Sequence, residues 1–322
     1  MTRVSVAMCT YNGEPYIGAQ LVSILNQSRP PDEVVICDDG STDDTAGVVV
    51  ALAGQTDVPV HFIRNDERLG VTANFEQAIA RTTGDVIFLS DQDDVWQPER
   101  IATMLQPFEA DAAVTLVYSD AEVVDDSLKP RDLRMLSYQR LAQVDSTDPF
   151  RVIQAEAEVA GALMAFSAAI KPYALPIVNG WFHDHGIALI AHATGHVVRI
   201  DRPLMAYRRH ANTVSGDSRF NQSIMAHVQQ ARRVSGRAVA EQSREMWQAM
   251  VTRLNSIEGN APQLNAYRAA ASARADLASA RALNAGRGLP RRATFAVNRL
   301  LRGDYHRFLR GWRSFARDLL LR

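Results

Sequence analysis

Short, nearly continuous apolar runs alternate with helical patterns along the first 120 residues of the chain. The apolar runs cover residues 4–9, 33–37, 58–63, 85–89 and 114–118. Because each run is apolar throughout rather than at every second position, we expect strands covered on both faces, as in a parallel sheet. A helical stripe covers 17–25, a second helix is expected to begin at a Ser41 cap, and a third covers about 72–84. This order predicts an α/β fold with an open, mostly parallel, doubly wound sheet.

The pattern changes in the second part of the chain. Residues 126–150 are polar and irregular, which predicts a loop. Strand patterns follow at 158–166 and 196–207, and a helix is expected between them over 181–192. After Gly216, Ala and Arg dominate and only helices are expected.

Charge divides the chain at nearly the same place. The net charge of −1 is the balance of −14 in residues 1–218 and +13 in residues 219–322. The acidic part needs a cation to offset its carboxylates, and the basic part suits phosphate or an anionic membrane surface. We therefore expect one domain over 1–215 and an Arg-rich helical C-terminal extension over 216–322.

Composition limits the class of protein. Hydrophobic residues make up 47% and charged residues 22% of the 322 positions, as in a globular protein. No apolar run reaches the roughly 18 residues that span a bilayer. With only Cys9 and Cys37 present, a disulfide-stapled secreted scaffold is excluded, and a reduced, cytoplasmic protein is expected.

Three polar motifs directly follow predicted strands. They are Thr10–Glu14, Asp38–Asp43 and Ser90–Trp96. The carboxyl ends of parallel strands meet at one edge of a sheet, so up to five carboxylates should gather there. A divalent cation such as Mg²⁺ or Mn²⁺ would relieve their repulsion. Taken singly, the second motif is equally a turn with a helix cap and the third a solvated loop.

Other nucleotide and metal motifs do not occur. The chain contains no Gly-x-x-x-x-Gly-Lys, no Gly-x-Gly-x-x-Gly and no EF-hand loop. The spacing of its histidines fits no His-Glu-x-x-His zinc helix.

The three motifs together resemble the family of inverting nucleotide-sugar glycosyltransferases numbered two, which has the GT-A fold. The resemblance covers about residues 1–215 and rests on Val6–Asn12, Ile36–Asp43 and Phe88–Trp96. The form Ser-Asp-Gln-Asp-Asp-Val-Trp is similar to a bacterial branch rich in rhamnosyltransferases of O-antigen and cell-wall polysaccharide assembly.

The resemblance implies a role for each matching position. The residues implied to bind the nucleotide sugar are Thr10, Tyr11, Asn12, Glu14, Asp39, Asp91, Gln92 and Arg208. Within this set, Asp39 would bond the pyrimidine ring and Asp91 would lie near the ribose. Asp93 and His210 are the implied metal ligands for Mg²⁺ or Mn²⁺, although a lone His is equally often structural.

Inversion needs a carboxylate that takes the proton of the acceptor hydroxyl. Asp184 stands where the family carries this base, in Trp181–Gly186, and the alternative for it is a helix N-cap. His185 follows it where the related branch commonly has an aromatic residue. Gly216 and the polar run after it suggest a lid over the donor.

These features together predict a metal-dependent enzyme that moves a single sugar, since the Gln-x-x-Arg-Trp segment of processive synthases is missing. The expected donor is dTDP-rhamnose, and the expected acceptor is a surface glycan such as a lipid-linked O-antigen or cell-wall saccharide. Alternatives are a hexosyl or N-acetylhexosaminyl transferase that uses a UDP-sugar, and a non-catalytic binding protein on the same fold. A nucleotidyltransferase would need a Gly-rich activating loop after the first strand.

Residues 291–322 hold nine Arg and two Asp among apolar side chains. The apolar positions at helical spacing are Leu301, Phe308, Trp312, Phe315 and Leu319. One cationic amphipathic helix of this kind suits peripheral contact with the inner face of the plasma membrane, near a polyprenyl-linked acceptor. Packing on the catalytic domain and a dimer interface are the alternatives. Nucleic acid is not expected, because Lys129 and Lys171 are the only lysines.

Overall fold

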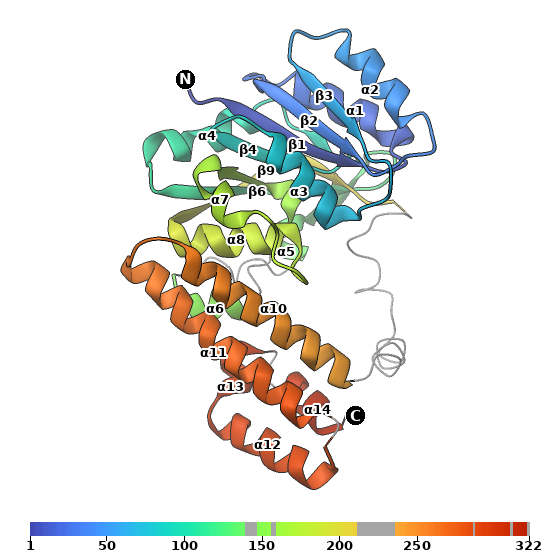
Figure 1. The fold of residues 1–322 in the computed structure, drawn as a ribbon. Helices are drawn as coiled ribbons and strands as arrows, with labels where there is room; N and C mark the ends of the chain where they lie inside the picture. The colour runs from blue at the N-terminus through green and yellow to red at the C-terminus, as the bar shows by residue number, and fades with distance from the viewer. Residues whose placement is uncertain (139–146, 156–158, 211–235, 286, 310–311, 321–322) are drawn as a thin grey trace. The chain divides into compact units, whose positions relative to one another are not determined.

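The computed structural model describes residues 1–138, 147–155, 159–210, 236–285, 287–309 and 312–320 (Figure 1). They form two compact units, each built from segments that are distant in sequence. The first contains the described residues within Met1–Asp145, Glu158–Ile177 and Phe182–His210. The second contains those within Ser146–Ala157, Val178–Trp181 and Ala211–Arg322. The expected domain boundary at 215 and the expected lid after Gly216 lie outside the described residues.

The first unit is built on one mixed sheet with the strand order β3-β2-β1-β4-β8-β6-β9-β5, and β7 pairs with β6. The strands are β1 (Val4–Thr10), β2 (Glu33–Asp38), β3 (Val60–Arg64), β4 (Val86–Ser90), β5 (Val95–Trp96), β6 (Val114–Val124), β7 (Pro130–Arg134), β8 (Met164–Ser167) and β9 (His196–Arg208). The α/β fold expected from the sequence is confirmed.

The first four long strands form the parallel part of the sheet. Every residue of β1, β2 and β4 is buried, which explains why these segments show no alternation of polar and apolar positions. The chain runs from β1 outward to β2 and β3 and then adds β4 on the opposite side of β1. Ligand sites of doubly wound sheets lie at the carboxyl ends of the strands beside such a reversal.

The other half of the sheet contains both parallel and antiparallel pairs. The sequence predicts a mostly parallel sheet, and in this half that prediction is wrong. β8 runs antiparallel to both β4 and β6, β6 and β9 are parallel, and β5 runs antiparallel to β9. An apolar run looks the same in sequence whichever way its neighbours run, so the pattern carried no direction.

Helices flank the sheet (Figure 1). In the first unit they are α1 (Glu14–Leu25), α2 (Thr45–Ala53), α3 (Val71–Arg81), α4 (Arg100–Ala110), α5 (Met135–Tyr138), α7 (Lys171–Ala174) and α8 (His183–Thr194), with 3-10 turns η2 (Gly161–Leu163) and η3 (Ala168–Ile170). α1 packs on α2, whereas α3, which leads back across the sheet, packs on β1 and β2.

Two local predictions are wrong. Ser41 does not cap α2, which begins at Thr45; its hydroxyl and its N–H both donate to the Asp38 carboxylate, and this closes the turn after β2. Residues 126–150 are not simply a loop, because they include β7, α5 and the start of α6 (Pro149–Gln154). All side chains of β7 are exposed, so no apolar period marks this edge strand in the sequence.

The described part of the second unit is helical. Besides α6 it contains α10 (Gly236–Ser256), α11 (Pro262–Asn284), α12 (Leu289–Leu301), α13 (Asp304–Phe308) and α14 (Trp312–Leu320). α10 and α11 lie side by side as a long pair (Figure 1). The upstream α6 is part of this unit, since the Phe150 ring packs on Phe308 at 5.5 Å and Gln154 Nε2 donates to the carbonyls of His306 and Leu309.

The single amphipathic helix expected within 291–322 is not formed. The chain turns at Gly303, where φ is +76°, so the predicted apolar stripe is distributed over three helices. Phe308 is buried with Leu277, Ala296 and Tyr305, whereas Leu301 is 80% exposed. Within the described residues, no helix is both long enough and apolar enough to span a bilayer.

Candidate functional site

Gln92 joins the segment after β4 to the segment after β1. Its Oε1 accepts hydrogen bonds from Thr10 Oγ1 at 2.5 Å and from the Tyr11 N–H at 2.9 Å, and its Nε2 donates to the Tyr11 carbonyl at 3.1 Å. A side chain at Gly13 would displace the Gln92 amide, because a Cβ there would lie 2.2 Å from Gln92 Oε1. Two residues implied to bind the nucleotide, Thr10 and Gln92, thus bond to each other.

Asn12 and Glu14 connect the segment after β1 to the segment after β2. Asn12, in the left-handed region at φ +48°, accepts a hydrogen bond from the Thr42 N–H at 2.8 Å. Glu14 accepts one from the Asp44 N–H at 3.0 Å, and its own N–H donates to Asp43 Oδ2 at 3.0 Å. Their side chains therefore hold the loops in place.

Asp39 lies at the end of β2 and is 4% exposed. Its carboxylate accepts hydrogen bonds from the N–H groups of Leu69 at 2.6 Å and Gly70 at 2.9 Å, and Arg68 Nε lies 3.7 Å away. The Arg68 guanidinium also lies 3.7 Å from the centroid of the Tyr11 ring. Asp39 and Tyr11 are thus brought to one place by the segment that precedes α3.

Three carboxylates from two segments of the chain lie close together. Burial, followed by the charges of Asp93 and Asp184, raises the pKa of Asp91 to about 7. A like charge has this effect only at short range. The Asp91 and Asp39 charges also contribute to raising the pKa of the buried Cys9 thiol, after burial and Cys37. The carboxylate cluster stays a prediction, which these electrostatic effects support.

Asp184 lies in the first turn of α8, where the helix dipole favours a negative charge. Its Oδ2 accepts a hydrogen bond from the Gly161 N–H at 3.2 Å, and Phe182, not Asp184, occupies the N-cap. His183 is buried beside it and stacks on Phe75 at 4.0 Å between centroids. The alternative of an N-cap for Asp184 is thus not what the structure has.

Arg208 and His210 approach the acidic segment from the end of β9. His210 Nε2 lies 2.7 Å from Asp93 Oδ2, and the imidazole stacks on the Tyr16 ring at 4.5 Å. Arg208 Nε donates to the Asp93 carbonyl at 2.7 Å, and its N–H donates to Asp94 Oδ1 at 3.1 Å. Arg208 therefore positions the backbone of the acidic loop, in a place where the resemblance implied a contact with the donor.

Arg100 is a buried cation that the sequence analysis did not single out. It is 0% exposed, and its guanidinium donates to Ser119 Oγ at 3.0 Å and to the Ala162 carbonyl at 2.8 Å. Burial lowers its pKa to about 9. The buried Asp94 opposes this shift, and its own pKa is raised well above the usual value by burial and by the neighbouring Asp93 and Asp91.

Gly161 and Tyr16 were also missed. A glycine inside a strand-like run is a sign of close backbone approach, and this sign could have pointed to Gly161. Nothing in the sequence distinguishes Tyr16 from other aromatic residues of an amphipathic helix. Arg100 resembles an ordinary exposed Arg at the start of a helix.

The donor set fits a divalent cation that takes few ligands from protein. Among the described residues, no group of three or more His, Cys, Asp or Glu side chains is placed to hold a metal by itself. Asp93 and His210 offer one oxygen and one nitrogen at hydrogen-bond distance from each other. Mg²⁺ and Mn²⁺ accept such sparse sites because water and substrate phosphates complete their coordination.

Comparisons with known proteins agree with this fold. Residues 5–164 match the family described as Glycosyl transferase family 2. An uncharacterized glycosyltransferase of Nostoc sp. is 29% identical over 130 residues, which are 40% of this chain and 40% of that protein. A putative teichuronic acid biosynthesis glycosyltransferase of Bacillus subtilis is 31% identical over 103 residues, 32% of this chain and 40% of that protein.

A similar arrangement is found among solved structures. TarS residues 1–349 of S. aureus, in complex with UDP, gives a TM-score of 0.57 at 15% identity, covering 91% of this chain and 78% of that one. This likeness concerns the fold and agrees with the expected GT-A type. The chain spans 40% of the length of the two curated relatives above. The family match includes Asp39, Asp91 and Asp93 and ends before Asp184, Arg208 and His210.

Proposed function

Residues 5–164 match glycosyltransferase family 2, and on this premise we propose that the chain moves one sugar from a nucleotide-sugar donor to a saccharide acceptor with inversion. The observation that carries the proposal is the contact at the end of β9, where His210 Nε2 lies 2.7 Å from Asp93 Oδ2. The raised pKa of Asp91, to which Asp93 and Asp184 contribute after burial, supports it. Asp184 lies beyond the family match, so its place in the proposal rests on its position in the first turn of α8, where the Gly161 N–H donates to its carboxylate.

Asp184 is the proposed general base. Its carboxylate takes the proton of the acceptor hydroxyl as that oxygen forms a bond to the sugar C1, and the bond from C1 to the diphosphate breaks with its electron pair leaving on the diphosphate. The Gly161 N–H donates to Asp184 Oδ2 at 3.2 Å and the His185 N–H donates to Oδ1 at 2.9 Å, so that both carboxylate oxygens keep a fixed direction. Asp184 is only partly buried, which leaves it accessible to an acceptor.

Asp93 and His210 are the proposed ligands of a divalent cation, Mg²⁺ or Mn²⁺. Such a cation, when bound, offsets the charge that develops on the leaving diphosphate. Arg208 keeps the Asp93 backbone in position, and Tyr16 supports the His210 ring.

The nucleoside is proposed to lie near Tyr11 and Asp39, with Asp91 toward the ribose. For the donor we propose dTDP-rhamnose, on the resemblance of the segment Ser90–Trp96, with a UDP-hexose or UDP-N-acetylhexosamine as the alternative. The similarity to a putative teichuronic acid biosynthesis glycosyltransferase supports a cell-surface glycan as acceptor.

A nucleotide-sugar panel tests the proposal. The purified chain is incubated with Mg²⁺ or Mn²⁺ and dTDP-, UDP- or GDP-sugars, and binding and release of nucleoside diphosphate are measured. Asp184→Asn should keep donor binding and remove transfer, whereas Asp57→Asn, at an exposed position of the same unit, should behave as wild type. Absence of metal-dependent binding for the whole panel would refute the proposal, and equal loss of binding and transfer in Asp184→Asn would refute the base. Binding without transfer or donor hydrolysis would indicate a binding protein.

A further inference from the structure

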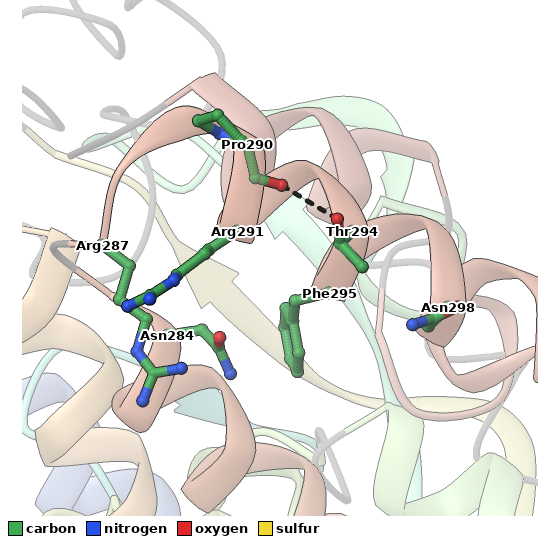
Figure 2. A pocket seen from close by; sticks show the side chains of 7 residues that line it. All are labelled: Asn284, Arg287, Pro290, Arg291, Thr294, Phe295 and Asn298. Carbon is green, nitrogen blue, oxygen red and sulfur yellow. Dashed lines mark hydrogen bonds between the residues drawn. The ribbon is translucent and has the colours of Figure 1, made fainter.

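A pocket of about 450 Å³ lies in the helical unit, where α11 ends and α12 begins (Figure 2). Its lining residues are Asn284, Arg287, Pro290, Arg291, Thr294, Phe295 and Asn298. Two of these side chains are cationic and three are polar and uncharged, and none of the lining residues is acidic. Figure 2 shows Asn284, Arg287 and Arg291 gathered on one side of the Phe295 ring.

The two arginines of the pocket differ from their neighbours in the same unit. Arg281 is paired with Asp318 at 2.5 Å and Arg299 with Asp304 at 2.9 Å. Arg287 and Arg291 are exposed and form no ion pair with the carboxylates of the described residues. Their charge is therefore available to an anion from outside the unit. A phosphate group suits two guanidinium groups well, because each can donate two hydrogen bonds to its oxygens.

On α12, a row of exposed apolar side chains lies beside the polar lining residues Thr294 and Asn298. Val297 and Leu301, one turn apart, are 44% and 80% exposed. Thr294 and Asn298 precede them by three residues each and therefore lie next to them on the helix surface. Trp312 of α14, which packs against α12, is 62% exposed. A helix face with cations and exposed apolar side chains in adjacent rows is typical of proteins that lie in a membrane interface.

We propose that the pocket and this row form a docking surface for an anionic phospholipid bilayer, with Arg287 and Arg291 on lipid phosphate and Val297 and Leu301 at the acyl boundary. A free phosphate would use the arginines but would leave the apolar row in water. Lipid uses both. The surface lies at the end of α11, in the following turn and on α12, instead of on the single amphipathic helix expected from the sequence. The proposal is independent of sugar transfer, because it is tested by binding alone.

Vesicle co-sedimentation tests the charged part of this docking surface. The full chain should bind vesicles of phosphatidylglycerol and phosphatidylcholine, bind pure phosphatidylcholine weakly, and lose binding at high salt. Arg287→Gln/Arg291→Gln should weaken binding by roughly tenfold or more. Arg81→Gln/Arg131→Gln removes the same charge at exposed positions of the sheet unit and should change binding little. Equal weakening in both double variants would overturn the assignment of the site.

The apolar part has its own test. Val297→Ser/Leu301→Ser leaves the charge unchanged and alters exposed positions, so circular dichroism and the thermal midpoint should stay as in wild type. Its binding to the anionic vesicles should fall by roughly tenfold, because buried apolar area contributes to interfacial binding. Binding unaffected by this variant would overturn the proposal. Binding of inorganic phosphate to Arg287 and Arg291 without any binding to vesicles would also overturn the proposal, in favour of a site for a soluble anion.

Discussion

The backbone N–H of Gly161 donates a hydrogen bond to Asp184 Oδ2 over 3.2 Å. Gly161 begins η2, and the next residue, Ala162, accepts a hydrogen bond from the buried Arg100. The proposed base is thus oriented by a backbone group whose own position is fixed by a buried cation. This arrangement suggests that the direction of the carboxylate, and not only its presence, matters for transfer.

Gly161→Ala should impair transfer and leave donor binding intact. The added Cβ would lie 2.8 Å from His183 Nε2, and His183 cannot easily yield because it stacks on Phe75. The displacement should move Asp184, so we expect kcat to fall by roughly 10- to 100-fold with little change in the donor KM. Steady-state kinetics measure both.

Two further variants separate positioning from general damage. Gly161→Ala/His183→Ala removes the clash between the added Cβ and the imidazole. The double variant should therefore lose less kcat than the effects of the two single substitutions combined would predict. Gly54→Ala adds a methyl group with only ordinary contacts, 3.7 Å at the nearest, and should be neutral. A donor KM that rises as much as kcat falls would contradict the positioning role.

Asp93→Asn should remove the metal dependence of nucleotide binding. Asp93 and His210 are the proposed ligands of the cation, and the neutral amide is a poorer ligand than the carboxylate. Titration calorimetry with UDP and dTDP should show that the wild type binds the nucleotide roughly tenfold more tightly, or more, with Mn²⁺ than with a chelator. Asp93→Asn should bind as wild type does with chelator, and the exposed Asp57→Asn should keep the full gain. A full gain in Asp93→Asn would place the cation elsewhere.

The strands were predictable because burial on both faces leaves a direct trace in sequence. Val34 to Cys37 and Val86 to Leu89 are apolar without interruption, and none of these residues is more than 3% exposed. β7 has only exposed side chains and leaves no such trace. The turn at Gly303 was not anticipated, since the spacing of apolar residues continues across it even though the helix does not.

The sequence indicated the acidic residues of the candidate site but not the groups that hold them in position. Asp91, Asp93 and Asp184 follow motifs of fixed order, so they could be placed before any coordinates. What holds them depends on tertiary contacts: Arg100 reaches Ala162 across 62 positions, and Arg208 reaches Asp93 across 115. The sequence also could not show that Gln92 and Glu14 would bond to neighbouring loops.

Gln92→Ala should loosen the connection between the segments after β1 and β4. The substitution removes three hydrogen bonds to Thr10 and Tyr11, two of them to backbone groups in a partly buried place. Leaving such groups unpaired costs about 1–3 kcal/mol, so the free energy of unfolding should fall by about that amount. Urea denaturation measures this change. Gln55→Ala, which removes one exposed hydrogen bond to the Ala51 carbonyl at the end of α2, should change it by less than about 0.5 kcal/mol.

The contribution of His192 to the stability of the sheet unit should decrease between pH 7 and pH 5, whereas the raised pKa of Asp91 acts in the opposite direction. Burial lowers the pKa of the His192 imidazole to about 4. In the unfolded chain the pKa returns to about 6.5, so the unfolded state binds more protons at this position between these two values. The His192 contribution to the free energy of unfolding therefore falls as the pH falls through this window, by about 2 kcal/mol at pH 5. His192→Gln cannot take up the proton and should show a correspondingly smaller loss in urea denaturation at the two pH values. The exposed His61→Gln, in the same unit, should keep the wild-type loss. Equal losses in wild type and His192→Gln would mean that His192 is accessible to protons in the folded protein.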